Sequence, residues 1–180
     1  MLNIDQLADK SKELGAAATG VIKTSDIQFS EEFRKLCEQN SCGKFGTNWM
    51  CPPAVDSYEA VKAKVLGFSK GFVFQTIYTV EDSFDFEGMM KAEEIHIGIF
   101  NKIFDYIKLH RDNSDVLALN VGACKVCKEC TYPDEACRFP DKAIASLEAY
   151  CIDVNALLAC CDIAYNNGPN TVSYVGLFLF

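Results

Sequence analysis

The sequence predicts a mixed α/β fold in which helices pack on a sheet of about four strands. Four segments are rich in β-branched and aromatic residues, as strands are. The segments between most of them repeat apolar residues at helical spacing, and a length of 180 residues suits a single domain. The predicted strands are residues 20–27, 71–80, 115–123 and 171–180.

The helices are predicted from caps and from apolar residues three and four positions apart. The longest segment places Phe86, Met89, Met90, Phe100 and Ile103 on one predicted buried stripe. Ser30 and Asp153 are typical N-caps, because their side chains accept hydrogen bonds from free backbone amides. The predicted helices are residues 4–15, 31–40, 56–66, 85–110, 140–150 and 153–163.

The charge balance argues against a nucleic-acid partner. The chain has 17 Lys and Arg against 25 Asp and Glu, a net charge of −8, and such a surface repels phosphates. The N-terminal segment lacks the pattern of a secretory signal. No run approaches the roughly 18 apolar residues of a membrane span. We therefore expect a cytoplasmic protein with no membrane partner.

Ten cysteines are the most informative feature of the composition. In a reducing cytoplasm, cysteines at motif spacing are metal ligands or redox groups more often than disulfides. The stretch GACKVCKECTYPDEAC places Cys124, Cys127, Cys130 and Cys137 in one loop. Thiolates at successive C-x2-C spacing can converge on corners of an iron–sulfur cubane. Zinc is the alternative, although four-cysteine zinc sites usually come as two separated C-x2-C pairs.

A first loop, SCGKFGTNWMCPP, adds to this pattern. It contains Cys42 and Cys51, and Cys37 precedes it. Its glycines would let backbone amides approach cluster sulfides, and such hydrogen bonds tune the reduction potential. Trp49, the sole tryptophan, would either shield a cluster from water or pack in the ordinary way.

Seven motif cysteines are one short of two fully cysteine-ligated clusters, which leaves three arrangements open. Cys151, Cys160 or Cys161 supplies the eighth thiolate; a different ligand or an open iron takes that place; or Cys137 joins the first loop. We expect Cys160 and Cys161 to be buried in a helix as small hydrophobic residues.

Other chemistries have no signature in the chain. There is no GxSxG, HExxH, Walker A or GxGxxG motif. His96 and His110 lie on one predicted helix, about 21 Å apart along its axis, too far for one metal ion. We expect both to be helix-surface residues.

The segments NSCGKFGTNWMCPP (40–53) and GACKVCKECTYPDEACRFPDKAIASLEAYCIDV (122–154) resemble a prokaryotic family of predicted metal-binding proteins, domain of unknown function twenty-two eighty-four. The resemblance extends over most of the chain, including TVSYVGLFLF at the end. In this family we expect glycine where this chain has Cys151. The resemblance implies metal binding without naming a reaction, and the cysteines it implicates are Cys37, Cys42, Cys51, Cys124, Cys127, Cys130 and Cys137.

We therefore expect a single metal-binding domain over residues 1–180, with one or two 4Fe–4S clusters. We expect it to transfer electrons to a redox partner protein, or to activate that partner reductively. Two alternatives stay open: a structural zinc-binding interaction module, and an enzyme that binds substrate at an open iron corner. The sequence does not decide whether the protein is an enzyme.

Overall fold

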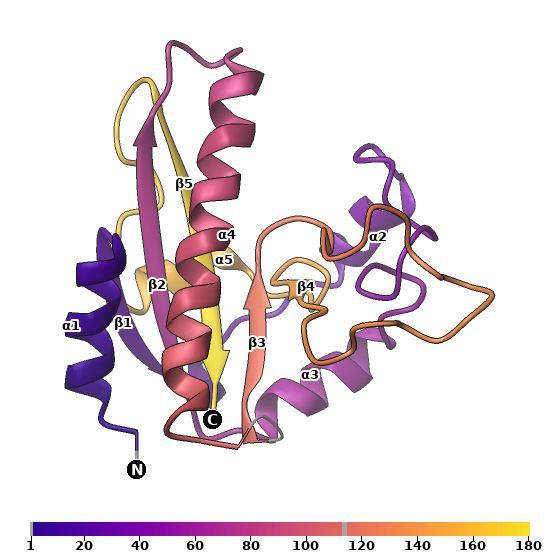
Figure 1. The fold of residues 1–180 in the computed structure, drawn as a ribbon, viewed down its shortest axis with the longest axis horizontal. Coiled ribbons are helices and arrows are strands. Elements are labelled where there is room, and N and C mark those ends of the chain that lie inside the picture. The colour runs from indigo at the N-terminus through magenta and orange to yellow at the C-terminus, as the bar shows by residue number, and fades with distance from the viewer. Residues whose placement is uncertain (1, 113–114) are drawn as a thin grey trace.

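A five-stranded mixed sheet organises the computed structural model, which describes residues 2–112 and 115–180 (Figure 1). The strand order is β1-β2-β5-β3-β4. Neighbours pair antiparallel except for β3 and β4, which are parallel. The strands are β1 (Ala18–Lys23), β2 (Lys70–Thr79), β3 (Leu117–Asn120), β4 (Ala145–Ser146) and β5 (Thr171–Leu179).

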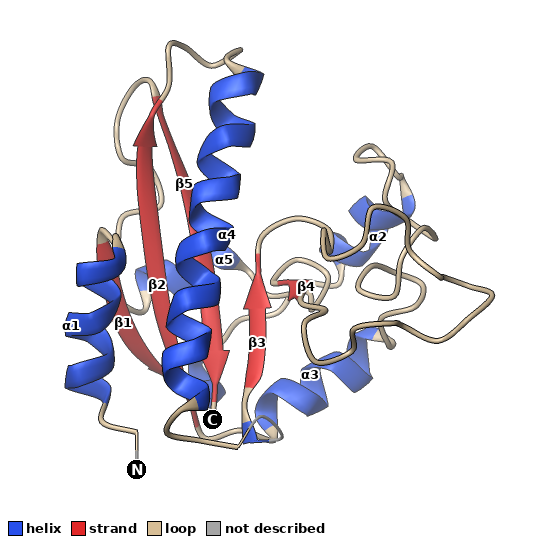
Figure 2. Ribbon diagram, viewed as in Figure 1, coloured by secondary structure: helices blue, strands red, loops and turns tan. Residues whose placement is uncertain are grey.

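Helices cover both faces of this sheet, so the predicted mixed α/β class is confirmed (Figure 2). Side chains of α1 and α4 pack on one face, and side chains of α3 and α5 pack on the other. The helices are α1 (Ile4–Leu14), α2 (Glu32–Glu38), α3 (Tyr58–Leu66), α4 (Phe86–Lys108) and α5 (Val154–Ala159), with a short 3-10 turn at Thr24–Asp26.

The two cores follow from the alternation of side chains along a strand. On β5, Phe178 faces the α1 and α4 side, whereas Leu177 and Leu179 face the α3 and α5 side. On β2, Phe72 and Phe74 join Phe178 in the aromatic core, and all three rings are fully buried. The sheet is therefore sealed on both faces.

The predicted helix over residues 140–150 is wrong. This segment forms turns around β4, and its backbone bonds to β3: the Leu147 amide donates to the Asn120 carbonyl over 3.1 Å. Ala145, Leu147 and Ala149 are buried in alternation with more exposed residues, which is a strand pattern. The predicted helix over 153–163 is shorter in the structure, at Val154–Ala159.

The buried stripe predicted for α4 holds along most of the helix but fails at its start. Phe100 and Ile103 are fully buried, whereas Phe86 is 67% and Met90 58% exposed. Neither Phe86 nor Met90 belongs to the buried clusters that cover the sheet. In the part of the chain that the structure describes, no helix is both long and apolar enough to cross a membrane.

The fold places the two cysteine-bearing segments at the same side of the molecule. Residues 121–144 connect the parallel strands β3 and β4 at one end of the sheet order. Residues 39–57 connect α2 to α3, and Figure 1 shows this loop beside the 121–144 loop. The sheet therefore brings together segments about 80 residues apart in the chain.

Candidate metal centre

The two cysteine-bearing loops are joined through Trp49. Its indole Nε1–H donates to the carbonyl of Glu135 over 3.1 Å. Its ring also meets Tyr132 edge to face, with 4.9 Å between centroids and an interplanar angle of 88°. Aromatic pairs favour this arrangement. The tryptophan of the first loop thus anchors it to the middle of the second.

The four cysteines of the second loop line one small cavity. Trp49 and Met50 of the first loop share its wall, so both loops build it. Cys137 faces the same space as the C-x2-C triplet of its own loop. The cysteines in the wall are Cys124, Cys127, Cys130 and Cys137.

Hydrogen bonds within the second loop hold its turns around these thiols. The Thr131 hydroxyl donates to the Ala136 carbonyl over 3.0 Å, and the Glu135 amide donates to the Thr131 carbonyl over 3.0 Å. Arg138 reaches across the loop and donates to the Glu129 carbonyl over 3.2 Å. These bonds bring the segment of Cys137 back towards Cys130 without regular secondary structure.

Burial and nearby donors act in opposite directions on three of the candidate thiols. Burial is the main reason that the pKa values of Cys37, Cys51 and Cys124 lie above the ordinary value. Hydrogen bonds act in the opposite direction: the backbone amides of Val126 and Ile144 lower the pKa of Cys124. The side chain of Asn48 does the same for Cys51. Such donors stabilise the thiolate form that binds metals.

The first-loop thiols lie close to one another and to the second loop. The neighbouring Cys42 and Cys51 raise the pKa of Cys37 through their charges. Cys42 and Cys124 do the same to Cys51, which connects the two loops. All ten cysteines of the chain lie in the described residues and are free thiols.

Among the described residues, the cysteines are not gathered as a site for one metal ion. Within residues 2–112 and 115–180, no three His, Cys, Asp or Glu side chains converge closely enough to hold a single metal ion. Four thiolates on one zinc ion would lie about 3.8 Å apart, given Zn–S bonds of about 2.3 Å. The assignment of the seven motif cysteines as ligands stays a prediction.

The model of a protein family described as "Predicted metal-binding protein (DUF2284)" matches residues 20–180. The chain belongs to this family. No curated protein matches it. A solved structure of epoxyqueuosine reductase from Bacillus subtilis is similar over 98% of this chain, with 11% sequence identity and a TM-score of 0.43. The match covers 46% of the reductase chain, so this chain spans about half of that protein's length.

Cys151 shows why we expect glycine at its position in this family. Its φ is 57°, in the left-handed region that glycine adopts at the least cost. The residue is fully buried, and its carbonyl accepts from the Ser30 amide over 2.9 Å. Burial raises the pKa of the Cys151 thiol, whereas the nearby Arg34 lowers it. The charge of Cys151 also raises the pKa of Cys37, so the Cys151 thiol lies near the first-loop cysteines.

Arg34 is a site residue that sequence reasoning missed. Its guanidinium donates to the carbonyls of Asp56 over 2.8 Å, Ala149 over 3.2 Å and Val55 over 3.3 Å. Its buried Nε has no hydrogen-bond partner among the described residues. The positive charge lowers the pKa of Cys37. A signal existed, because Arg34 precedes Cys37 by three residues and so shares its face of α2.

The expectation for Cys160 and Cys161 is only half right. Cys161 packs on the core beside Gly20, where a Cβ on the glycine would lie 2.6 Å from the cysteine Cβ. Cys160 is exposed, with its sulfur 3.9 Å from the Asp26 carbonyl. The prediction that Cys160 is buried is therefore wrong, because this residue is the C-cap of α5 and lies on the solvent side.

The histidine expectation is wrong for His96. Its side chain is fully buried and stacks on Phe74, with 5.1 Å between ring centroids. Thr76 and Asn120 bond its two ring nitrogens, each over 2.8 Å. Polar partners on two strands therefore allow a histidine inside the apolar stripe of α4. His110 is exposed, as expected.

Proposed function

We propose that this protein holds one or two 4Fe–4S clusters and transfers electrons to, or reductively activates, a partner protein. The observation that carries the proposal is the cavity lined by Cys124, Cys127, Cys130 and Cys137 together with Trp49 of the other loop, which bonds to Glu135. Membership of a predicted metal-binding family supports metal binding by this chain.

The donor set suits an iron–sulfur cluster. Each of the four candidate ligands is a soft thiol, and cubane clusters take four cysteine thiolates. Each cysteine binds a different iron of a cubane, so the thiolates must surround a volume. The successive C-x2-C spacing of Cys124, Cys127 and Cys130 supports that arrangement over a zinc site, whose four cysteines usually come as two separated C-x2-C pairs.

Groups next to the cysteines would tune such a cluster. The backbone amides of Val126 and Ile144 act on Cys124 by lowering its pKa, and amide donors at such sulfurs raise the reduction potential of a cluster by stabilising its more negative state. Trp49 forms part of the cavity wall, where its ring would shield a bound cluster from water. When bound, the cluster would supply one-electron transfer, whereas these residues set its potential and exposure.

The first-loop thiols support a second cluster. The charges of Cys42 and Cys51 raise the pKa of Cys37, and the charges of Cys42 and of Cys124 in the second set raise the pKa of Cys51. Cys151 is the additional thiol that interacts with Cys37, and Arg34 lies beside both. We propose Cys37, Cys42, Cys51 and Cys151 as the second ligand set in this chain. Because we expect glycine at position 151 in other members of the family, Cys151 would be a ligand specific to this chain.

A net charge of −8 supports docking to a basic surface of the redox partner. Such contacts weaken as salt rises. The ten free thiols support a reducing compartment, and we place the protein in the cytoplasm on this ground.

Absorption spectroscopy tests the proposal. Protein purified under anaerobic conditions should be brown, with broad absorption near roughly 400 nm that dithionite bleaches. A colourless preparation that contains one zinc ion per site and no iron would contradict the redox function and support a structural zinc site.

A further inference from the structure

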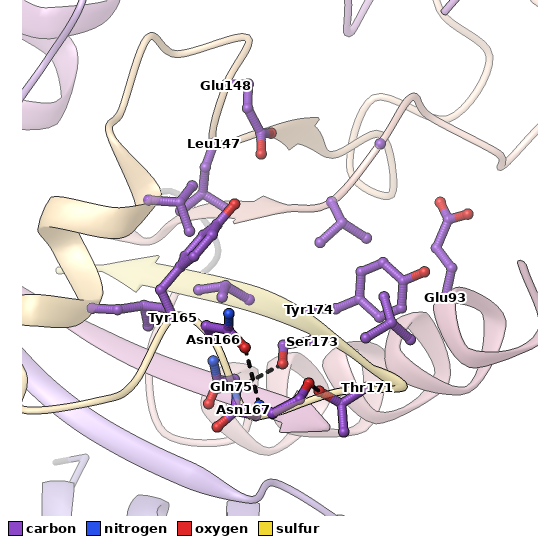
Figure 3. Close-up of a pocket in the computed structure, with 17 residues that line it drawn as sticks. Gln75, Glu93, Leu147, Glu148, Tyr165, Asn166, Asn167, Thr171, Ser173 and Tyr174 are labelled. Carbon is purple, nitrogen blue, oxygen red and sulfur yellow. Dashed lines mark hydrogen bonds between the residues drawn. The ribbon is translucent and has the colours of Figure 1, made fainter. Parts of the chain in front are cut away.

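A second cavity lies beside the second cysteine loop and is separate from the cavity of the thiols. Its volume is about 760 Å³, within the range of about 300–1,000 Å³ typical of small-molecule sites. Figure 3 shows Tyr165 on one side of it and Glu93 with Tyr174 on the other. Val121 and Gly122, at the start of the cysteine loop, complete the wall.

Several polar side chains in this wall donate hydrogen bonds to the protein itself. Gln75 Nε2 donates to the Ala164 carbonyl over 2.9 Å, and the Tyr174 hydroxyl donates to the Met89 carbonyl over 2.7 Å. Asn167 Nδ2 donates to Ser173 Oγ over 2.8 Å and to the Ala164 carbonyl over 3.3 Å. The amide oxygens of Gln75 and Asn167 remain to accept hydrogen bonds from a ligand.

The charged side chains that line this cavity are both acidic. Among the described residues, no Lys, Arg or His lines the cavity, whereas the carboxylates of Glu93 and Glu148 do. Apolar side chains such as Val172, Val175 and Leu158 supply the rest of the surface. Lys125, outside the wall, offsets part of the charge of Glu93 over 2.8 Å, whereas Glu148 forms no ion pair within the described part of the chain. Anions would therefore meet a net negative wall, and molecules with N–H donors would meet acceptors.

We propose that this cavity binds a small organic molecule that is cationic or rich in N–H donors. Glu93 is the residue that recognises it, with Glu148 as the second carboxylate. The inference goes beyond the proposed redox function, because it depends on the acceptors in the wall and holds for either metal.

Glu93 also connects this cavity to the metal loop. Its Oε2 pairs with Lys125 Nζ over 2.8 Å, and Lys125 lies between Cys124 and Cys127. Its Oε1 lies against Gly122, where a Cβ would come within 2.8 Å of the oxygen. A ligand that bonds to Glu93 would therefore contact a carboxylate already attached to the cysteine loop, which places the ligand next to the metal centre.

Three probes of the same shape test the charge preference of the cavity. Benzamidine is a cation with N–H donors, benzamide is neutral, and benzoate is an anion. Saturation-transfer NMR on the anaerobically purified protein measures the affinity of each. We expect benzamidine to bind at least about tenfold more tightly than benzoate, a difference of about 1.4 kcal/mol, with benzamide between them. Equal affinities for benzamidine and benzoate would overturn the proposal.

Substitutions locate the binding. Glu93→Gln should weaken benzamidine about tenfold and leave benzamide nearly unchanged. Glu59→Gln is the matched control, because Glu59 is exposed on α3 and does not line this cavity. Val172→Trp should fill the cavity and remove binding of all three probes, with folding checked by circular dichroism. Unchanged benzamidine affinity in Glu93→Gln, or in a folded Val172→Trp protein, would contradict the site.

Discussion

The Nε2–H of His96 donates to Asn120 Oδ1 over 2.8 Å and joins the middle of α4 to the last residue of β3. The Oδ1 of asparagine only accepts, so Nε2 carries the proton. Burial lowers the pKa of His96 to about 4, so near neutral pH the other ring nitrogen carries no proton and accepts from the Thr76 hydroxyl. The imidazole is therefore neutral and held in one tautomer. Asn120 is four residues before Cys124, so this buried bond fixes the strand that leads into the cysteine loop.

Acid should destabilise the fold through His96. Burial lowers the pKa of His96 from 6.5 to about 4. Between these values the unfolded chain binds more protons, so the free energy of unfolding should fall as pH drops from 6.5 towards 4. The contribution is fully present above pH 6.5 and amounts to about 3 kcal/mol. Denaturant titrations at several pH values measure it.

His96→Gln is the control for this pH dependence. The variant keeps polar atoms near Thr76 and Asn120 but has no group that titrates in this range. Its free energy of unfolding should change less than that of the wild type between pH 6.5 and 4. Parallel curves for the two proteins would show that His96 is not the responsible group.

Substitution of Trp49 should loosen the contact between the loops. Trp49→Phe keeps an aromatic edge for Tyr132 but loses the hydrogen bond to Glu135, at a cost of about 1 kcal/mol. Trp49→Ala loses both contacts and removes an aromatic side chain from the cavity wall. Metal loss to a chelator should be slowest in the wild type and fastest in Trp49→Ala. Equal rates in all three proteins would mean that Trp49 does not shield the metal.

Arg34→Met should weaken the first-loop site. The variant loses donors to Asp56, Ala149 and Val55, so we expect a loss of about 1–3 kcal/mol in the free energy of unfolding. Arg34→Lys keeps the charge near Cys37 but cannot make the same set of bonds. Thermal denaturation and metal content measure both effects. A stable Arg34→Met protein with full metal content would contradict the role of Arg34.

Cysteine variants should separate the two ligand sets. Cys51→Ser should remove the metal of the first set and keep that of the second, and Cys127→Ser should do the reverse. Cys160→Ser is the matched control, because Cys160 belongs to neither ligand set. It is exposed, and its sulfur lies beside the Asp26 carbonyl. If the Cys51→Ser protein retained all its metal, the proposal of a second cluster would be contradicted.

The four long strands could be predicted because each concentrates β-branched and aromatic residues, and all four occur in the structure. Strand β4 was missed because its two residues are too few to show a period, and the acidic and apolar residues around Leu147 also suit a helix. His96 was misplaced because its partners, Thr76 and Asn120, lie on strands distant in sequence.

The spacing of Cys124, Cys127 and Cys130 indicated a metal loop directly, because local spacing determines which thiols can converge. The meeting of this loop with Trp49 depends on the position of β3 and β4 in the sheet, which the order of elements along the chain does not determine. The role of Arg34 likewise rests on carbonyls from segments distant in sequence, and a sequence pattern does not reveal them.

Iron, acid-labile sulfide and zinc content of anaerobically purified protein tests the central claim most directly. The proposal predicts about four iron and four sulfide per chain for one cluster, or about eight of each for two. Zinc in stoichiometric amount, with neither iron nor sulfide, would contradict it.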